Sequence, residues 1–398
     1  MAIRAASAEV EAPARGTPPG RVWLLLGDKP GDNAQVEAVA LALGWACERR
    51  TLCWRPPYAT QKPRFRVTLD HVDSERSQPL EPPWPDLVMT IGRRPSMAAL
   101  WVKAQSAGRT RLVLFGKPSG AVDRFDLIVA GAEVQLPLGP NVLPIRLPLM
   151  RARASEIEAA AARWRARLDP LPRPLVAILV GGPTVPFAFD HRVADRVLAL
   201  AAGIARDGGT PYISTSRRTP RAAVEALRAG LPPGVRRFEW MPDSSDNPYL
   251  ALLGLADGFI VTGDSVSMLA EVVRAQKPLA ILDLPLGPLG GIDQVRRELA
   301  RWLFQPDGGG LRRLVAAGAV RSRLLDATRD FRAFHRMLFD AGLAVRAGEP
   351  LRPPTGAVPD DLPAVVARIG ALMDPGPSAR RPEARPEERV QYHSGRPE

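Results

Sequence analysis

Short apolar runs that alternate with amphipathic stretches constrain the fold of this chain more than any other feature of its sequence. Each run has four to six residues and is bounded by Gly, Pro or Asp. A first series lies at 22–26, 87–91, 111–115 and 127–130, and a second at 175–180, 212–215, 259–262 and 279–283. The pattern is typical of parallel sheets whose two faces are covered by helices.

Segments with helical periodicity separate the runs, at 34–43, 96–105, 190–206, 221–229 and 267–275. We therefore expect an α/β fold with two Rossmann-like domains, at 21–150 and 174–305, which face each other across a cleft. Residues 306–374 are expected to form C-terminal helices that close the two domains, and the segments at about 326–344 and 361–373 are expected to have no strand partners. The Pro- and Arg-rich ends, 1–20 and 375–398, are predicted to be disordered tails.

The net charge of +12 is spread over the body of the chain, because both ends are nearly neutral. Such a surface attracts anionic ligands or anionic lipid. The basic composition is not accompanied by a zinc finger, an RNP sequence or a basic zipper, so we expect no specific nucleic-acid partner.

No apolar stretch reaches the roughly 18 residues of a membrane helix, so no transmembrane segment is expected. The first residues lack the apolar core of a secretory signal, which favours a cytoplasmic protein. Two cysteines, Cys47 and Cys53, are too few for a disulfide framework or a complete metal site.

The turn after the first apolar run reads GDKPGDNAQ and concentrates polar side chains between a strand and a helix. Glycines let a backbone approach a ligand closely, and Asp32 or Asn33 is suited to cap the helix. The candidate residues of this turn are Gly27, Asp28, Lys29, Gly31 and Asn33. The alternative interpretation is an ordinary capped turn between a strand and a helix.

A second turn, after the run at 87–91, reads GRRP. Gly92 and Arg93 stand at its start, where a guanidinium can bind phosphate or carboxylate oxygens with two parallel hydrogen bonds. A solvated loop explains the same residues equally well in so Arg-rich a chain.

In the second half of the chain, glycines and hydroxyls follow three apolar runs. Free N–H groups at a helix start suit a diphosphate, and Glu271, within the last of these helices, can accept hydrogen bonds from ribose or sugar hydroxyls. Its alternative role is a glutamate that interacts with the helix dipole. The candidates are Gly181, Gly182, Thr184, Ser216, Arg217, Arg218, Asn247, Thr262, Gly263, Asp264, Ser265, Ser267 and Glu271.

Common catalytic signatures are missing from the sequence. The first turn is neither a GxGxxG nor a P-loop, and no HExxH or GxSxG occurs. These absences weaken NAD, ATP, metalloprotease and serine-hydrolase interpretations.

Five blocks in order resemble the mitochondrial fission ELM ("elongated mitochondria") family, bacterial branch. They are GDKPGDNAQ at 27–35, GRRP at 92–95, SRRTP at 216–220, DNPY at 246–249 and DSVSM at 264–268, within a resemblance that covers about 21–305. The family resembles GT-B glycosyltransferases, with twin Rossmann-like domains and a nucleotide-sugar cleft. Some bacterial members are labelled as nucleoside-diphosphate-sugar epimerases, and plant members are associated with recruiting a dynamin-related protein.

The resemblance implies a nucleotide-diphosphate sugar as ligand or substrate, with no cofactor or metal. The turns at 181–184 and 262–267 would hold the diphosphate, and Asp28, Lys29 and Asn33 would lie near the reaction centre, with Asp28 as base. The chain departs from the family pattern at 116–119, 130–133 and 143–146, all on the acceptor side. The alternative is a non-catalytic scaffold that recruits a membrane-remodelling or envelope partner.

Overall fold

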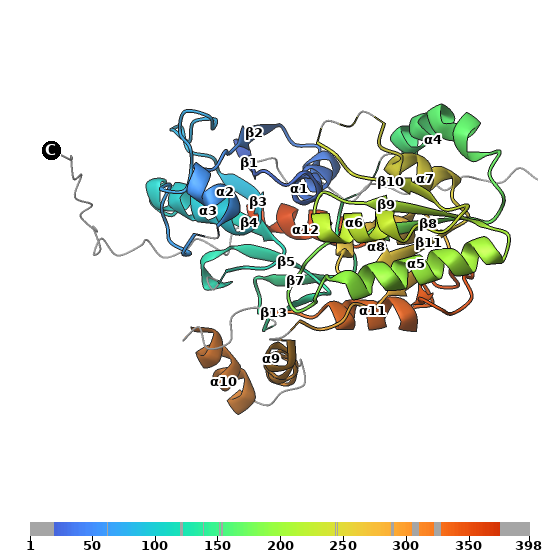
Figure 1. Cartoon of the computed structure of the whole chain (residues 1–398). Helices are drawn as coiled ribbons and strands as arrows, with labels where there is room; N and C mark the ends of the chain where they lie inside the picture. The colour runs from blue at the N-terminus through green and yellow to red at the C-terminus, as the bar shows by residue number, and fades with distance from the viewer. Residues whose placement is uncertain are drawn as a thin grey trace, which may run out of the picture.

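A computed structural model gives the structure of the chain, and two six-stranded parallel sheets dominate it (Figure 1). Residues 20–374 are described apart from 62, 120–121, 138, 151, 153, 243, 245, 288–289, 305–309 and 322–327. The predicted tails at 1–20 and 375–398 lie outside the described residues, except for Gly20.

The first sheet has the strand order β2-β1-β3-β4-β5-β7. Its strands are β1 (Val22–Leu26), β2 (Cys47–Thr51), β3 (Leu87–Ile91), β4 (Arg111–Phe115), β5 (Leu127–Gly131) and β7 (Val142–Ile145). Its helices are α1 (Pro30–Leu43), α2 (Pro56–Thr60), α3 (Arg93–Gln105) and the short 3-10 helix η1 (Val122–Arg124).

The two faces of this sheet explain why its strands are apolar throughout. Trp23 and Leu25 of β1 pack with α3, whereas Leu24 and Leu26 pack with α1 on the opposite face. Side chains of a strand alternate between the two faces, so a sheet that helices cover on both sides needs an uninterrupted apolar run.

The second sheet has the order β10-β9-β8-β11-β12-β14. Its strands are β8 (Leu175–Val180), β9 (Thr210–Thr215), β10 (Arg236–Phe238), β11 (Gly258–Thr262), β12 (Leu279–Leu282) and β14 (Val345–Arg346). The helices around it are α4 (Ala154–Leu168), α5 (His191–Arg206), α6 (Arg221–Ala229), α7 (Tyr249–Leu255), α8 (Val266–Arg274) and α11 (Phe331–Asp340). One face packs on α4, α7, α8 and α11 and the other on α5 and α6.

The C-terminal segment ties the two domains together. Helix α12 (Leu362–Met373) returns to the first domain, where Val365 and Ile369 are fully buried beside α1. Asp361 accepts three hydrogen bonds from Arg146, from its main-chain N–H, Nε and Nη2. This helix fixes the second domain's C-terminal segment to the first domain.

The expectation that the segment at about 326–344 has no strand partners is wrong, because it contains β13 (Thr328–Arg329), and β14 follows directly after it. Strand β14 pairs with β12, and β13 pairs antiparallel with β6 (Val134–Gln135) of the first domain. Strands of two residues bury too little apolar surface to leave a periodic signal in the sequence.

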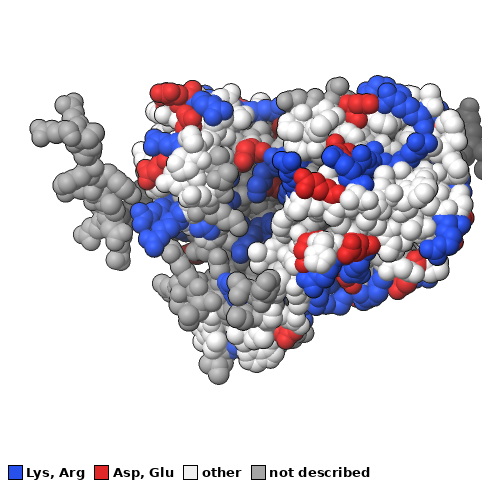
Figure 2. Space-filling model, viewed as in Figure 1, with Lys and Arg blue, Asp and Glu red and all other residues white. Residues whose placement is uncertain are grey.

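Two Rossmann-like domains and a returning C-terminal helix constitute a GT-B-like arrangement, which confirms the predicted fold class. In Figure 2 a recess separates the two halves of the molecule, and Lys or Arg side chains lie in it. Helices α9 (Gly290–Leu303) and α10 (Gly310–Arg321) lie below both sheets in Figure 1. Among the described helices, none is long and apolar enough to cross a bilayer.

Candidate functional site

The candidate residues gather where the strand order of each sheet reverses. In the first sheet this switch point lies between β1 and β3, and in the second between β8 and β11. Open parallel sheets bind ligands in the crevice beyond the strand ends at such a point. The turns that follow these four strands are those that the sequence singles out, at 27–33, 92–95, 181–184 and 263–267.

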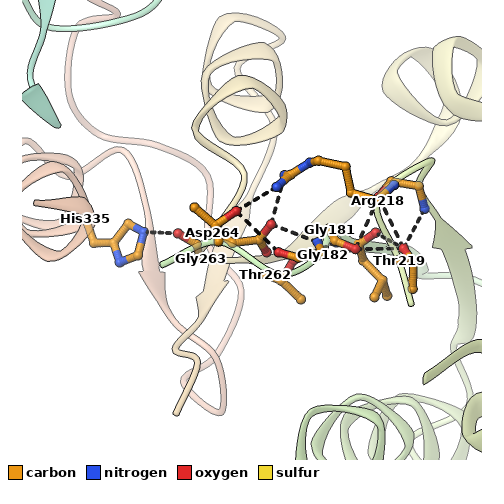
Figure 3. Close-up of polar contacts among 11 residues, drawn as sticks. Gly181, Gly182, Arg218, Thr219, Thr262, Gly263, Asp264 and His335 are labelled. Carbon is orange, nitrogen blue, oxygen red and sulfur yellow. Dashed lines mark hydrogen bonds and ion pairs between the residues drawn. The ribbon is translucent and has the colours of Figure 1, made fainter. Parts of the chain in front are cut away.

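An ion pair occupies the switch point of the second sheet (Figure 3). Asp264 Oδ2 lies 2.9 Å from Arg218 Nη2 and accepts a hydrogen bond of 2.9 Å from the Gly182 N–H. Arg218 Nη1 also donates to Thr184 Oγ1 at 2.7 Å. Burial raises the pKa of Asp264, although Gly182 and Arg218 both favour its charged form.

The two glycines after β8 are required by close approach. A Cβ on Gly181 would collide with the Asp264 carboxylate, and a Cβ on Gly182 would collide with the main chain of Arg218. The Gly181 carbonyl accepts hydrogen bonds from Ser216 Oγ at 3.2 Å and Thr219 Oγ1 at 2.7 Å. The hydroxyls after β9 therefore hold the glycine turn in place.

A buried histidine contacts the turn after β11 (Figure 3). His335 Nε2 lies 2.8 Å from the Gly263 carbonyl oxygen, which can only accept, so Nε2 carries the proton. Burial lowers the pKa of His335 below its ordinary value and so favours the neutral imidazole. Helix α11 thus positions the start of α8.

Helix α8 begins at the same turn, with Ser265 as its N-cap. The Ser265 hydroxyl accepts no cap hydrogen bond from the described N–H groups of the first turn. The Leu269 N–H is the first amide of the helix to donate back, to the Ser265 carbonyl. Ser267 lies in the first turn and is half-buried. The first-turn N–H groups of α8 are therefore suited to an anionic ligand.

One turn further along α8, Glu271 Oε2 accepts a hydrogen bond from Tyr249 Oη. Burial raises the pKa of Glu271, and it raises the pKa of Tyr249 well above its ordinary value. Arg274, on the same helix, donates to the Pro148 carbonyl at 2.7 Å and so joins α8 to the segment between the domains.

The first domain carries a cavity of about 280 Å³ at its switch point. Its lining includes Gly27, Asp28, Lys29, Asp32, Asn33, Trp54, Gly92, Arg93 and Arg94. Trp54 Nε1 donates to Asp28 Oδ1 at 2.8 Å, and Arg94 Nη1 lies 3.8 Å from the same oxygen. Asp28 is thus held in a fixed orientation and remains half-exposed.

Asn33 closes the turn on itself, because its amide accepts from the Gly27 N–H and donates to the Gly27 carbonyl. The prediction that Asp32 or Asn33 caps the helix is wrong. Helix α1 begins at Pro30 with Lys29 as N-cap, so both residues lie in its first turn. Proline is favoured at the first helical position, which explains the earlier start.

Glu133 is a buried acid that the sequence interpretation did not select. It follows β5 and is 9% exposed, and among the described residues none donates a hydrogen bond to its Oε2. Burial raises its pKa; Arg329 opposes that shift and the charge of Asp32 adds to it. Its main-chain carbonyl accepts from the Asp330 N–H of the second domain's C-terminal segment. The signal in the sequence that could have selected Glu133 was its position just after an apolar strand.

Other predicted residues lie apart from these clusters or have local roles. Asn247 Oδ1 accepts from the Tyr249 N–H at the start of α7. Arg217 is exposed beside Arg218, and Arg93 Nε donates to the Pro63 carbonyl. Gly31 lies in the first turn of α1. No group of three His, Cys, Asp or Glu side chains within the described residues is placed to share a metal ion.

Comparisons with known proteins place this geometry in a family context. The family model described as mitochondrial fission ELM1 matches residues 30–301. A relative from Arabidopsis thaliana, mitochondrial fission protein ELM1, is 22% identical over 227 residues, which cover 52% of this chain and 53% of the relative. The alignment thus spans about half the length of each protein.

Two of the similar solved structures carry uridine nucleotides in their descriptions. Staphylococcus aureus MnaA with UDP is 10% identical, with a TM-score of 0.45 and coverage of 89% of this chain and 97% of that one. Neisseria meningitidis UDP-GlcNAc 2-epimerase bound to UDP-GlcNAc is 11% identical, with a TM-score of 0.45 and coverage of 88% and 99%. The family model spans more than half of the chain, in agreement with the resemblance of the five sequence blocks. The protein belongs to the mitochondrial fission ELM1 family.

Proposed function

We propose that this chain is a cytoplasmic protein that binds a nucleotide-diphosphate sugar in the recess between its domains and transfers the sugar to an acceptor. The observation that carries the proposal is the convergence of four features at the switch point of the second sheet. They are the Gly181-Gly182 turn, the start of α8, Arg218 and Glu271. Helix N-termini and guanidinium groups stabilise the negative charge of a diphosphate.

The other groups fit the rest of such a ligand. Tyr249 engages Glu271 Oε2, and no described residue donates to Oε1, so this oxygen can accept from a ribose hydroxyl. In the transfer reaction, an acceptor oxygen would attack the anomeric carbon of the sugar while the bond between that carbon and the diphosphate breaks. The bonding electrons leave with the diphosphate, and the acceptor proton passes to Asp28, which Trp54 orients.

Calorimetric titration with UDP, GDP and CDP sugars tests the proposal. We expect one of them to bind, and Glu271→Gln to weaken that binding about tenfold, because a charged hydrogen bond contributes roughly 1.5–3 kcal/mol. Glu225→Gln is the matched control, since Glu225 pairs with Arg221 on the surface of α6. If Glu271→Gln binds as the wild type does, α8 is not the nucleotide site.

A non-catalytic scaffold is the second candidate, and a specific observation favours it. The Asp264 carboxylate already occupies the Gly182 N–H and Arg218, two donors that a diphosphate would use. The protein would then keep the fold to recruit a partner, in a family whose name refers to mitochondrial fission. Absence of binding to every nucleotide sugar in the titration favours this role.

A further inference from the structure

Exposed apolar side chains concentrate on two helices that the proposed nucleotide site does not use. Of the eight large hydrophobic residues exposed within the described part of the chain, five lie on α9 and α10. They are Val295 (67% exposed), Leu299 (46%), Trp302 (57%), Leu314 (72%) and Val315 (51%). Single exposed hydrophobic residues are ordinary, but a concentration on one pair of helices indicates an interaction surface.

On α9 the exposed apolar residues form a stripe. Val295, Leu299 and Trp302 are spaced by four and three residues, which places them on one face of a helix. Ala300 and Leu303 are buried against Ala316 of α10. At 100° per residue, the centre of the stripe lies about 100° around the helix from the midpoint of Ala300 and Leu303, and the described residues leave the stripe exposed.

Positive charge borders the stripe. Arg296 is exposed on one side of it, and Arg301, 43% exposed, lies on the other. The guanidinium carbon of Arg312, from α10, lies 4.4 Å from the centre of the Trp302 ring. A cation–π pair of this kind keeps an arginine and a tryptophan together at the same edge of the surface.

A cavity of about 100 Å³ opens beside the stripe, between α9 and α11. Four arginines line it, Arg297, Arg301, Arg332 and Arg336, against two acids, Glu298 and Asp330. Asp330 is paired with Arg301 and lies 3.9 Å from Arg336. The net positive charge of this lining suits an anionic group such as a phosphate.

We propose that α9 and α10 dock on an anionic lipid surface. The stripe enters the boundary between headgroups and acyl chains, with Trp302 at the interface, and the bordering arginines contact lipid phosphates. An apolar protein partner would account for the stripe alone. It would not account for arginines on both flanks and a basic cavity beside the stripe on a chain of charge +12. The proposal does not depend on nucleotide binding.

Co-sedimentation of the full chain with vesicles tests this docking. We expect binding to vesicles that contain phosphatidylglycerol, little binding to phosphatidylcholine alone, and weaker binding as salt rises. Leu299→Glu should reduce binding at least tenfold, since it places a charge in the apolar boundary. Leu41→Glu is the matched control, because Leu41 is 74% exposed on α1 and far from α9 in sequence.

A second pair of variants tests the contribution of the arginines to vesicle binding. Arg296→Gln should weaken vesicle binding about fivefold, which corresponds to roughly 1 kcal/mol per basic residue near an anionic surface. Arg221→Gln, whose side chain is 92% exposed on α6, should leave it unchanged. Melting temperatures should not change, because all four substitutions lie on the surface.

Three results would overturn the docking. One is no binding to the phosphatidylglycerol vesicles, and another is equal loss in Leu299→Glu and Leu41→Glu. The third is a concentration-dependent dimer that Leu299→Glu abolishes while vesicles are not bound, which would assign the stripe to a contact between two copies of the chain.

Discussion

Asp264 and Arg218 face each other at 2.9 Å across the switch point of the second sheet, and the two partners differ in burial. The Asp264 side chain is fully buried, whereas that of Arg218 is 43% exposed. The pair therefore places a carboxylate inside the turn that we propose for the diphosphate and leaves the Arg218 guanidinium partly exposed. Whether this turn accepts a diphosphate depends on how easily the ion pair breaks, so that Arg218 can bind a phosphate instead of Asp264.

Replacement of the buried carboxylate should strengthen nucleotide binding. Asp264→Asn keeps an acceptor for the Gly182 N–H but removes the negative charge and releases Arg218. We expect at least a fivefold gain in affinity, because two charges about 4 Å apart interact by roughly 1 kcal/mol even in water. Calorimetry with the best nucleotide sugar measures the effect. Unchanged affinity would mean that the phosphates do not approach Asp264.

The two neighbouring arginines provide a matched pair. Arg218→Lys replaces a fork that reaches Asp264 and Thr184 with a point charge, so nucleotide affinity should fall about tenfold or more. Arg217→Lys changes an exposed residue, and both its affinity and its stability should stay within about 0.5 kcal/mol of the wild type. If Arg218→Lys and Arg217→Lys bind the nucleotide sugar with equal affinity, Arg218 does not contact the phosphates.

Glu133 should make the protein less stable as the pH rises. Its pKa is raised in the folded state, so between about 4.5 and that higher value the folded chain holds a proton that the unfolded chain has lost. The free energy of unfolding therefore falls with pH through this window. The Glu133→Gln side chain resembles the protonated carboxyl group and has no proton to lose, so the variant should lack this pH-dependent loss of stability.

Urea unfolding of the wild type and Glu133→Gln at a series of pH values checks this prediction. The two proteins should be closest in stability below pH 4.5, and the variant should become the more stable one as the pH rises. Other shifted groups, among them Asp264 and His335, are common to both proteins and largely cancel in the difference. A constant difference across the pH range would contradict the assignment.

The sequence predicted the central strands well because both of their faces are buried. The runs at 22–26, 87–91, 111–115 and 175–180 coincide with β1, β3, β4 and β8. Strands β2 and β10 were missed. They lie at the sheet edges and read CERRT and RRF. Charged side chains are tolerated in an edge strand because one side of it is exposed to solvent, so the strand leaves no apolar run in the sequence.

For the candidate site, the sequence indicated the turns but not their supports. Glycines and hydroxyls at strand ends stand out locally, as at Gly181 and Thr262. Glu133 and His335 do not, because each acts on a residue or element distant in sequence. Tyr249 stands in the DNPY block, but its contact with Glu271 is not apparent there. His335, for example, contacts Gly263 from 72 residues away. Only the packing of α11 beneath β11 brings these two together, and no local pattern encodes that packing.

The contact between Gly263 and His335 can be tested by a double-mutant cycle. A Cβ on Gly263 would lie 2.5 Å from His335 Cε1. Since Gly263 has no positive φ, its backbone accepts alanine and the obstacle is the imidazole alone. Gly263→Ala should therefore destabilise the protein by about 1–3 kcal/mol through overpacking.

His335→Ala removes the hydrogen bond to the Gly263 carbonyl and leaves a cavity, which should cost about 2–3 kcal/mol. In the double variant the new methyl group enters that cavity, so the combined loss should be smaller than the sum by about 1 kcal/mol or more. Gly203→Ala, a helical glycine of α5 with nothing within 4 Å of its Cβ position, is the control and should be neutral or stabilising. If the two losses simply add in urea unfolding, His335 does not set the position of the turn that begins α8.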